Sequence, residues 1–277
     1  SGFVLVLLYV KGPLTQLIST LPLLGQTQIA IKRLAELSLR FSNPEANLFV
    51  PTSKKHPPQG AGSIELKGVT YTYSDASGST VFSLGPVNLC IKTGEMLFLV
   101  GENGSGKTTL IKLLLGLYEP QEGMILLDGA PVVAGNRDDY RQLFSTVFSD
   151  YYLFEDFVIG KDFAAEASVY LERLKLTHKV SVKDGKFSTT DLSTGQRKRL
   201  ALVHAYLDLR PVIIFDEWAA DQDPAFRRVF YTEILPELKR DGNTVIVISH
   251  DDRYFHVADR VVHMANGRTI THDHTQK

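Results

Sequence analysis

The chain has 277 residues, 44% of them hydrophobic and 22% charged, which is ordinary for a globular protein and excludes a collagen-like repeat, a coiled-coil rod and a disordered acidic tail. Its 30 basic and 31 acidic side chains leave a formal net charge of −1, so nothing in the overall charge indicates nucleic acid as a partner. The length fits one large domain or two modest ones.

The first 62 residues differ in pattern from the rest. The apolar run Phe3–Val10 is too short to cross a bilayer alone and lacks the basic region that precedes a signal peptide. We interpret it as the end of a truncated membrane helix, with an ordinary buried strand as the alternative. Helical spacing continues to Phe41, so residues 1–41 are expected to be the end of a transmembrane domain and its cytoplasmic helical extension. The proline-rich residues 42–62 indicate a linker, and residues 63–277 the main domain.

Several strands are expected from Ser63 onwards. Alternating apolar residues predict strands over 64–73, broken around Gly68, and again over Val87–Ile91. The single cysteine, Cys90, lies in this second stretch, and we expect a buried, inert thiol there. Short, continuously apolar strands are predicted at 96–100, 212–215 and 244–249, and helices at 108–117 and 197–209. Such strands, separated by helices, predict a parallel sheet that is covered on both faces.

A glycine-rich loop follows the strand at 96–100. It fits the pattern G-x-x-x-x-G-K-[ST] without a mismatch: Gly101, Glu102, Asn103, Gly104, Ser105, Gly106, Lys107 and Thr108. Glycines let the backbone N–H groups wrap around phosphate, and the following helix adds its positive N-terminal end. Lys107 is expected to reach the β- and γ-phosphates, the Thr108 hydroxyl to ligate Mg²⁺, and Thr109 to bind the nucleotide beside them. The loop predicts nucleotide binding.

Two acidic residues end the apolar strand at 212–215. Asp216 lies at the carboxyl end of that strand, where ligands bind in open α/β sheets, and a carboxylate there is expected to hold Mg²⁺ directly or through water. Glu217 is placed to polarise an attacking water. Alone, such a pair is more often an ordinary strand end, but downstream of a phosphate loop we interpret it as catalytic.

A third motif indicates the family. The string Leu192-Ser193-Thr194-Gly195-Gln196 contains an S-x-x-Q capping box and precedes a predicted helix. It closely resembles the LSGGQ signature of the ATP-binding cassette (ABC) ATPases, with Thr194 in place of the first glycine. In that family, the signature of one subunit closes over the γ-phosphate of ATP bound to the other. The resemblance therefore implies a head-to-tail homodimer around two Mg-ATP, and a helix N-terminus suits an anion.

The same resemblance covers roughly residues 63–277 and assigns further roles. Tyr73 lies where the family stacks an aromatic ring on adenine, although a core or sheet-surface tyrosine is the alternative. Asp223 matches the aspartate of the D-loop, and His250 matches the switch histidine that contacts γ-phosphate. Ser149 takes the place of the usual glutamine near Mg²⁺, with Asp150 as the competing ligand.

The implied fold is that of a P-loop NTPase of ABC type, with a mixed sheet core, an antiparallel β subdomain, a small helical subdomain and an N-terminal helical segment. The helical subdomain is expected between Asp150 and Leu192. An aromatic patch near its start either docks coupling helices of a membrane domain or forms the subdomain's own core: Phe148, Tyr151, Tyr152, Phe154 and Phe157.

The strings at 194–200 and 215–224 look most like the bacterial exporters of cyclic peptides and siderophore precursors, in which a membrane domain precedes the ATPase domain in one chain. This implies an ATPase that powers export across the bacterial inner membrane, with the ATPase domain on its cytoplasmic face. The implied partners are the transmembrane domain of the same chain and a peptide-like cargo. The alternative is a soluble ABC ATPase of the translation or DNA repair type.

Overall fold

The computed structural model describes Thr27 and residues 31–33, 62–74, 79–149, 153, 164–183 and 186–270. Contacts divide the chain into two units, residues 1–55 and 56–277. In the first unit, Thr27 and residues 31–33 are helical. No helix among the described residues is long and apolar enough to cross a membrane. The remaining predictions for residues 1–41 and 42–62 fall almost wholly outside the described residues.

A six-stranded sheet forms the centre of the second unit, with strand order β12-β11-β3-β10-β9-β6. All neighbouring strands pair in parallel except β12, which pairs antiparallel with β11, so the sheet is mixed as expected. The strands are β3 (Met96–Val100), β6 (Phe144–Val147), β9 (Val212–Asp216), β10 (Thr244–Ile248), β11 (Arg260–Ala265) and β12 (Arg268–Ile270).

Side chains of the central strands are buried on both faces of this sheet. Along β10, Val245 and Val247 pack into one hydrophobic cluster, and Ile246 and Ile248 into the other. Successive side chains of a strand point to opposite faces, so a continuous apolar run indicates cover on both sides. The prediction from the three apolar strands is confirmed.

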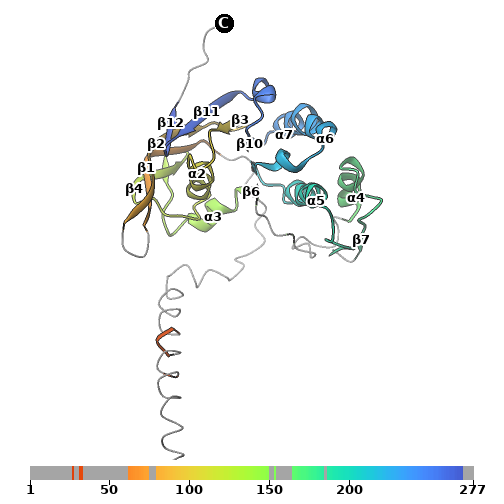
Figure 1. Cartoon of the computed structure of the whole chain (residues 1–277), viewed down its shortest axis with the longest axis horizontal. Helices are drawn as coiled ribbons and strands as arrows, with labels where there is room; N and C mark the ends of the chain where they lie inside the picture. Colours follow the sequence, from red (N-terminus) through yellow and green to blue (C-terminus); the bar gives the residue numbers. More distant parts are fainter. Residues whose placement is uncertain are drawn as a thin grey trace, which may run out of the picture. The chain divides into compact units, whose positions relative to one another are not determined.

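A four-stranded antiparallel sheet, in the order β2-β1-β4-β5, lies on one side of the central sheet (Figure 1). Its strands are β1 (Ile64–Ser74), β2 (Thr80–Ile91), β4 (Glu122–Leu127) and β5 (Ala130–Pro131). The expected break at Gly68 is a shift in register within one continuous strand, because Gly68 takes a φ of +59° and the pairing of β1 with β2 is offset between Leu66 and Val69.

Cys90 is exposed, so the expectation of a buried thiol is wrong. The reason lies in the two-residue period of β2. Val87, Leu89 and Ile91 turn inward and are buried, whereas Asn88 and Cys90 turn outward. The apolar residues around Cys90 therefore alternate with it instead of enclosing it.

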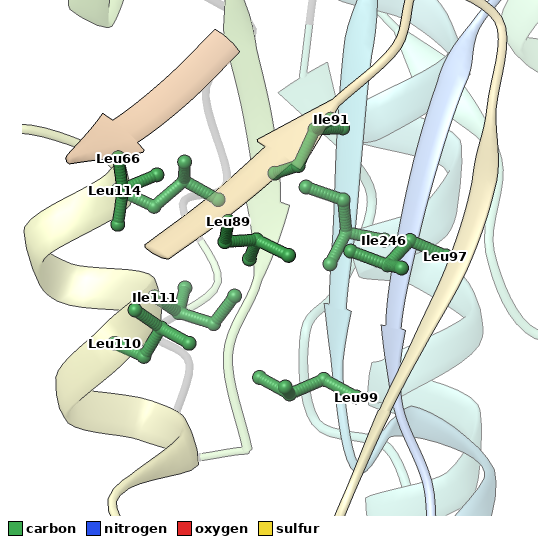
Figure 2. Close-up of a pocket in the computed structure, with 9 residues that line it drawn as sticks. All are labelled: Leu66, Leu89, Ile91, Leu97, Leu99, Leu110, Ile111, Leu114 and Ile246. Carbon is green, nitrogen blue, oxygen red and sulfur yellow. The ribbon is translucent and has the colours of Figure 1, made fainter. Parts of the chain in front are cut away.

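Helix α2 (Lys107–Leu114) fills the space between the two sheets, and the short helix α3 (Arg137–Arg141) lies nearby (Figure 1). Figure 2 shows the inward face of α2, where Leu110, Ile111 and Leu114 face Leu89 of β2 and Leu99 of β3. The void enclosed by this all-aliphatic lining measures about 10 Å³. It can hold at most about one water, and it offers that water no polar partner. The phosphate loop is thus attached to a tightly packed support.

The opposite face of the central sheet is covered by the later helices (Figure 1). They are α4 (Ala164–Arg173), α5 (Thr194–Leu207), α6 (Pro224–Val229) and α7 (Leu235–Arg240), with a π-helical turn over Phe230–Ile234 between the last two. Helix α4 packs on α5 through the stacked rings of Tyr170 and Tyr206. Together with α4, the hairpin β7 (Val182–Lys183) and β8 (Lys186–Phe187) lies in the region expected for the helical subdomain, and the sequence did not predict this hairpin.

Candidate functional site

A cleft of about 550 Å³ lies beside the phosphate loop, where β3 and β9 end. In the described part of the chain it is lined by Tyr73, Phe82, Asn103, Gly104, Gly106, Lys107, Thr108, Thr109, Ser149 and Glu217. All of these except Phe82 were predicted from the sequence. Segments that are far apart in the chain therefore meet in one cavity, as the motifs required.

The phosphate loop bends sharply between β3 and α2, and glycine is needed for it. Gly106 takes a φ of +102°, and a Cβ there would lie 2.9 Å from the ring of Phe82 and 3.0 Å from Leu84 Cδ1. Any larger residue would meet both backbone strain and a clash. Gly101, Glu102 and Ser105 belong to the same loop without lining the cleft, and the backbone N–H of Ser105 donates to the Glu102 carbonyl at 3.1 Å.

The Lys107 ammonium group is held inside the curve of the loop. Its Nζ donates to the carbonyl oxygens of Gly101 at 2.7 Å and Glu102 at 2.9 Å. Burial lowers the pKa of Lys107, and the nearby charges of Glu217 and Asp216 act in the opposite direction. A phosphate group would supply the charge that favours the protonated ammonium, so the site suits an anionic ligand.

Oxygen atoms that could ligate a metal ion lie at the cleft and directly behind it: Thr108 and Ser149 line the cleft, and Asp216 contacts Thr108. The Thr108 hydroxyl donates to Asp216 Oδ2 at 3.4 Å, and Ser149 lines the same cavity. Asp216 is almost fully buried at 1% exposure. A carboxylate with hydroxyl groups and space for phosphate oxygens is the donor set that Mg²⁺ prefers at phosphate sites. The residues present therefore fit a magnesium ion. Asp150, the competing ligand, lies outside the described residues.

His250 does not line the cleft itself but contacts Glu217, which does. His250 Nε2 lies 3.1 Å from Glu217 Oε1, and both side chains are partly exposed. Glu217 adopts a left-handed backbone conformation with a φ of +51°, which is unusual for a residue with a side chain. Such conformations are retained where surrounding contacts hold them, and they occur often at active sites. The structure thus brings together two residues that the sequence separates by 33 positions.

The residues on either side of His250 are firmly held. The buried Tyr231 hydroxyl lies 2.7 Å from Ser249 Oγ, and Ser249 Oγ accepts the backbone N–H of Asp251 at 3.0 Å. Burial raises the pKa of Tyr231 to about 12, so it stays a neutral hydroxyl. Hydrogen bonds from Arg253 lower the pKa of Asp251, which keeps this carboxylate charged. Tyr231 comes from the π-helical turn, a feature that is frequent at functional sites.

An aromatic cluster forms one wall of the cleft. Tyr73 meets the edges of Tyr71 and Tyr118, which stack on each other with ring centroids 5.0 Å apart. Phe82 lies 6.4 Å from Tyr73 between ring centroids and lines the cleft with it. Tyr73 combines both alternatives, since it belongs to a sheet-surface aromatic cluster and also borders the cavity. Phe82 had no sequence signal, because an aromatic residue in a strand is ordinary.

The signature residues lie apart from this cleft. Ser193 caps α5: its hydroxyl accepts the backbone N–H of Gln196 and the Gln196 side chain reaches back to Ser193, as the capping box predicted. Thr194 and Gly195 form the first turn of α5. None of these four residues lines the cleft of its own chain. They form an exposed helix N-terminus, the kind of backbone site that suits an anion.

Asp223 is also outside the cleft. Its carboxylate caps α6 by accepting the backbone N–H of Phe226 at 2.9 Å, and it pairs with Arg199 of α5. The hydrogen bond from Phe226 lowers the pKa of Asp223, and that from Arg199 adds to the effect. Asp223 therefore links the segment after β9 to the signature helix.

The fold and these motifs agree with comparisons to known proteins. The model of the family described as "ABC transporter" matches residues 84–220. The "ATP-binding protein SyrD" of Pseudomonas syringae pv. syringae is 48% identical over 98% of this chain and 50% of its own length. An "ATP-dependent lipid A-core flippase" of Methylobacillus flagellatus is 34% identical over 76% of this chain and 37% of its own length. The chain thus spans about half, or less, of the relatives it matches.

Two solved structures share the fold. A bacterial ABC exporter with ATP bound has a TM-score of 0.65 at 22% identity, over 92% of this chain and 46% of that chain. A dimeric ATP-binding cassette in a post-hydrolysis state, bound to ADP and Pi, has a TM-score of 0.62 at 23% identity, over 74% of this chain and 96% of that chain. The family match, the relatives and the cleft lead to one conclusion: this chain contains the ATP-binding domain of the ABC transporter family and is an ATPase.

Proposed function

We propose that the chain binds Mg-ATP in the cleft and hydrolyses it when two copies associate head to tail. The observation that carries the proposal is the meeting of Lys107, Thr108 and Glu217 in one cavity from separate segments of the sequence. The volume of the cleft is within the range of small-molecule sites. Tyr73 and the aromatic wall are proposed to receive the adenine ring.

The proposed reaction is attack of water in line with the bond between the β- and γ-phosphates. Catalysis of phosphoryl transfer rests on positioning and on stabilisation of charge. Lys107 and the N–H groups of its loop bind the phosphate oxygens, Glu217 orients the water and accepts its proton, and His250 holds the γ-phosphate. Thr108, Asp216 and Ser149 would hold Mg²⁺, which would neutralise charge on the phosphate oxygens.

The second half of the site is proposed to come from a partner copy. Ser193, Thr194, Gly195 and Gln196 lie outside the cleft of their own chain, yet they form a helix N-terminus with an exposed cap. In a head-to-tail dimer, this terminus and the nearby Asp223 would face the γ-phosphate in the partner's cleft. A symmetric dimer then contains two equivalent sites.

We further propose that ATP hydrolysis powers export by a larger protein. The flippase that resembles this chain is more than twice as long as the segment they share. A transmembrane domain of the same protein, in the bacterial inner membrane, would bind the cargo, while the ATPase domain lies on the cytoplasmic face. The resemblance of the strings at 194–200 and 215–224 to the bacterial exporters of cyclic peptides and siderophore precursors supports a molecule of that class as cargo.

Transport by inside-out vesicles tests this function. The full-length protein that carries this sequence would be placed in vesicles with the ATPase domain outside, and ATP-dependent uptake of a labelled cyclic lipopeptide would be measured beside that of a labelled lipid A precursor. Uptake of the peptide, lost in Glu217→Gln, is the expected result. Uptake of the lipid alone would contradict the cargo, and ATP hydrolysis without any membrane association would favour the soluble alternative.

Ser149 provides a prediction about Mg²⁺. A serine side chain is shorter than the usual glutamine, so we expect its hydroxyl to act on the ion through a water molecule. Ser149→Ala should then raise the Mg²⁺ concentration for half-maximal hydrolysis only modestly. Loss of an orienting group at a dedicated metal centre typically costs about 10- to 100-fold in metal affinity, and we expect a smaller shift here because phosphate oxygens supply part of the coordination.

Asp150→Asn is the matched comparison for Ser149→Ala. We expect it to shift the Mg²⁺ requirement less than Ser149→Ala does, because a further carboxylate beside Asp216 and Glu217 would add repulsion before the ion binds. Titration of ATPase activity with Mg²⁺ at saturating ATP measures both variants. A larger shift for Asp150→Asn would make Asp150 the working ligand.

A further inference from the structure

Lys198 is buried in the signature helix α5 although its sequence context predicts exposure. It lies in the polar string Arg197-Lys198-Arg199, where Arg197 is exposed and Arg199 half-buried, but only 2% of the Lys198 surface is accessible. Lysine is almost never fully buried unless its charge is paired. The partners of Lys198 therefore explain how a charged side chain can be buried at this position.

Both partners belong to the segment that follows β9. Lys198 Nζ donates to the backbone carbonyl of Glu217 at 2.9 Å and forms an ion pair with Asp221 Oδ2 at 2.7 Å. In a third contact the donor comes from the segment after β9: Trp218 Nε1 donates to the backbone carbonyl of Lys198 at 2.8 Å. Trp218 is itself buried and stacks on Phe230. The second turn of α5 is thus fastened to the Glu217 carbonyl and to two residues that follow it, Trp218 and Asp221.

The contact with Glu217 acts on an unusual piece of backbone. Glu217 has a φ of +51°, a strained conformation for a residue with a side chain, and such strain persists only where surrounding contacts hold it. Its carbonyl oxygen accepts Lys198 Nζ and also the backbone N–H of Ala220 at 3.2 Å. Of these two bonds, the one from the ammonium group is shorter and charge-assisted, so it is the stronger. The orientation of the Glu217 peptide decides where its carboxylate points.

We propose that Lys198 is a positioning residue for the water-orienting carboxylate: it holds the Glu217 peptide in its left-handed conformation and ties it to the helix whose N-terminus carries the signature. The inference rests on the role proposed for Glu217. Asp221 balances the charge of Lys198 from the half-exposed side of the pair. One helix then serves two sites, because its end faces the partner's ATP and its second turn sets the geometry of its own.

Lys198→Met tests the proposal, since methionine fills a similar volume without donor or charge. Because the Asp221 side chain is half-exposed, water can solvate the carboxylate that loses its partner, and the variant leaves no buried charge unpaired. A misplaced catalytic group can cost about 100-fold in rate, so we expect kcat to fall about 10- to 100-fold, with the KM for ATP changed less than about threefold. Lys239→Met, which removes the α7 partner of the ion pair with Asp259, is the control and should keep wild-type kcat.

The double variant Lys198→Met with Glu217→Gln separates a positioning role of Lys198 from a general structural role. Residues that act as one unit have non-additive effects, so Lys198→Met should lower single-turnover hydrolysis little further once Glu217 is Gln. Lys198→Gln, which keeps a neutral donor, should give a kcat between those of wild type and Lys198→Met. It replaces Lys198→Met in these comparisons if that variant does not fold.

Three results would overturn the proposal, and each has a distinct meaning. Wild-type kcat in both Lys198 variants, while Glu217→Gln is inactive, would remove Lys198 from the mechanism and leave the proposed function intact. A full, multiplicative loss in the double variant would show that Lys198 acts independently of Glu217. Unchanged hydrolysis in Glu217→Gln would refute the proposed role of Glu217, and the inference with it. All measurements use the full chain.

Discussion

Glu217→Gln is expected to lower the rate of ATP hydrolysis by about 10²–10⁴-fold, the usual contribution of a general base, while ATP still binds. The reason is that glutamine cannot take a proton from water, whereas Lys107 and the phosphate loop remain intact. Single-turnover hydrolysis and equilibrium binding of labelled ATP measure the two properties separately. Weak binding together with slow hydrolysis would instead indicate damage to the cleft.

The same variant should also accumulate as a dimer in Mg-ATP. In the proposed cycle, closure around two nucleotides ends when hydrolysis removes the γ-phosphate, so a chain that closes without hydrolysis stays closed. Size-exclusion chromatography of Glu217→Gln with Mg-ATP, with Mg-ADP and without nucleotide reports this. A monomer under all three conditions, at an ATP concentration that saturates the cleft, would contradict ATP-driven closure.

Lys107→Ala should weaken the binding of ATP about 10- to 100-fold, because it removes hydrogen bonds from a charged donor to the phosphates, and such bonds contribute about 1.5–3 kcal/mol each. Ser193→Arg should leave binding by a single chain unchanged, because Ser193 does not line the cleft of its own chain. It should nevertheless block hydrolysis, since a long side chain at the helix N-terminus would obstruct the partner's γ-phosphate.

Thr27→Ala is a neutral control for this pair, because Thr27 belongs to the unit of residues 1–55 and not to the cleft. Binding isotherms for ATP on each variant, measured together with steady-state hydrolysis, separate the two effects. Loss of binding in Ser193→Arg would mean that the signature acts within its own chain. Normal hydrolysis in Ser193→Arg would remove the signature from the site altogether.

The central sheet and the phosphate loop could be predicted because local sequence determines them. A short apolar run such as Met96–Val100 needs burial on both faces, whatever packs there. The phosphate loop depends on backbone conformations that only glycine adopts readily, so glycines at fixed spacing mark it in the sequence. The capping box at Ser193 is likewise a contact between residues three positions apart.

The features that sequence did not reveal depend on contacts between distant segments. Lys198 is buried only because Glu217 and Asp221 come from another segment to pair with it. Phe82 joins the cleft because β2 lies beside β1, where Tyr73 is. Cys90 is an exception, because local sequence determines its exposure. Val87, Leu89 and Ile91 alternate along the strand with a period of two, and this alternation places Cys90 on the outward face.

Only one member of the aromatic patch predicted near the helical subdomain lies among the described residues. Phe148 is partly buried against the hydrophobic cluster that contains α2, whereas the residues of the helical subdomain pack in the other cluster, so this member does not belong to the subdomain's own core. The other four members lie outside the described residues: Tyr151, Tyr152, Phe154 and Phe157. Docking of coupling helices onto them stays a prediction.

Mixing two inactive variants tests most directly whether the site is shared between two chains. A dimer of Lys107→Ala with Ser193→Arg places both changes at one composite site and leaves the other site with an intact Lys107 and an intact signature. Each variant is first shown to be inactive alone, and hydrolysis is then measured after equal amounts of the two full-length chains are mixed. The head-to-tail arrangement predicts that the mixture regains ATP hydrolysis that neither variant shows by itself. A mixture that forms mixed dimers and remains as inactive as its components would contradict it.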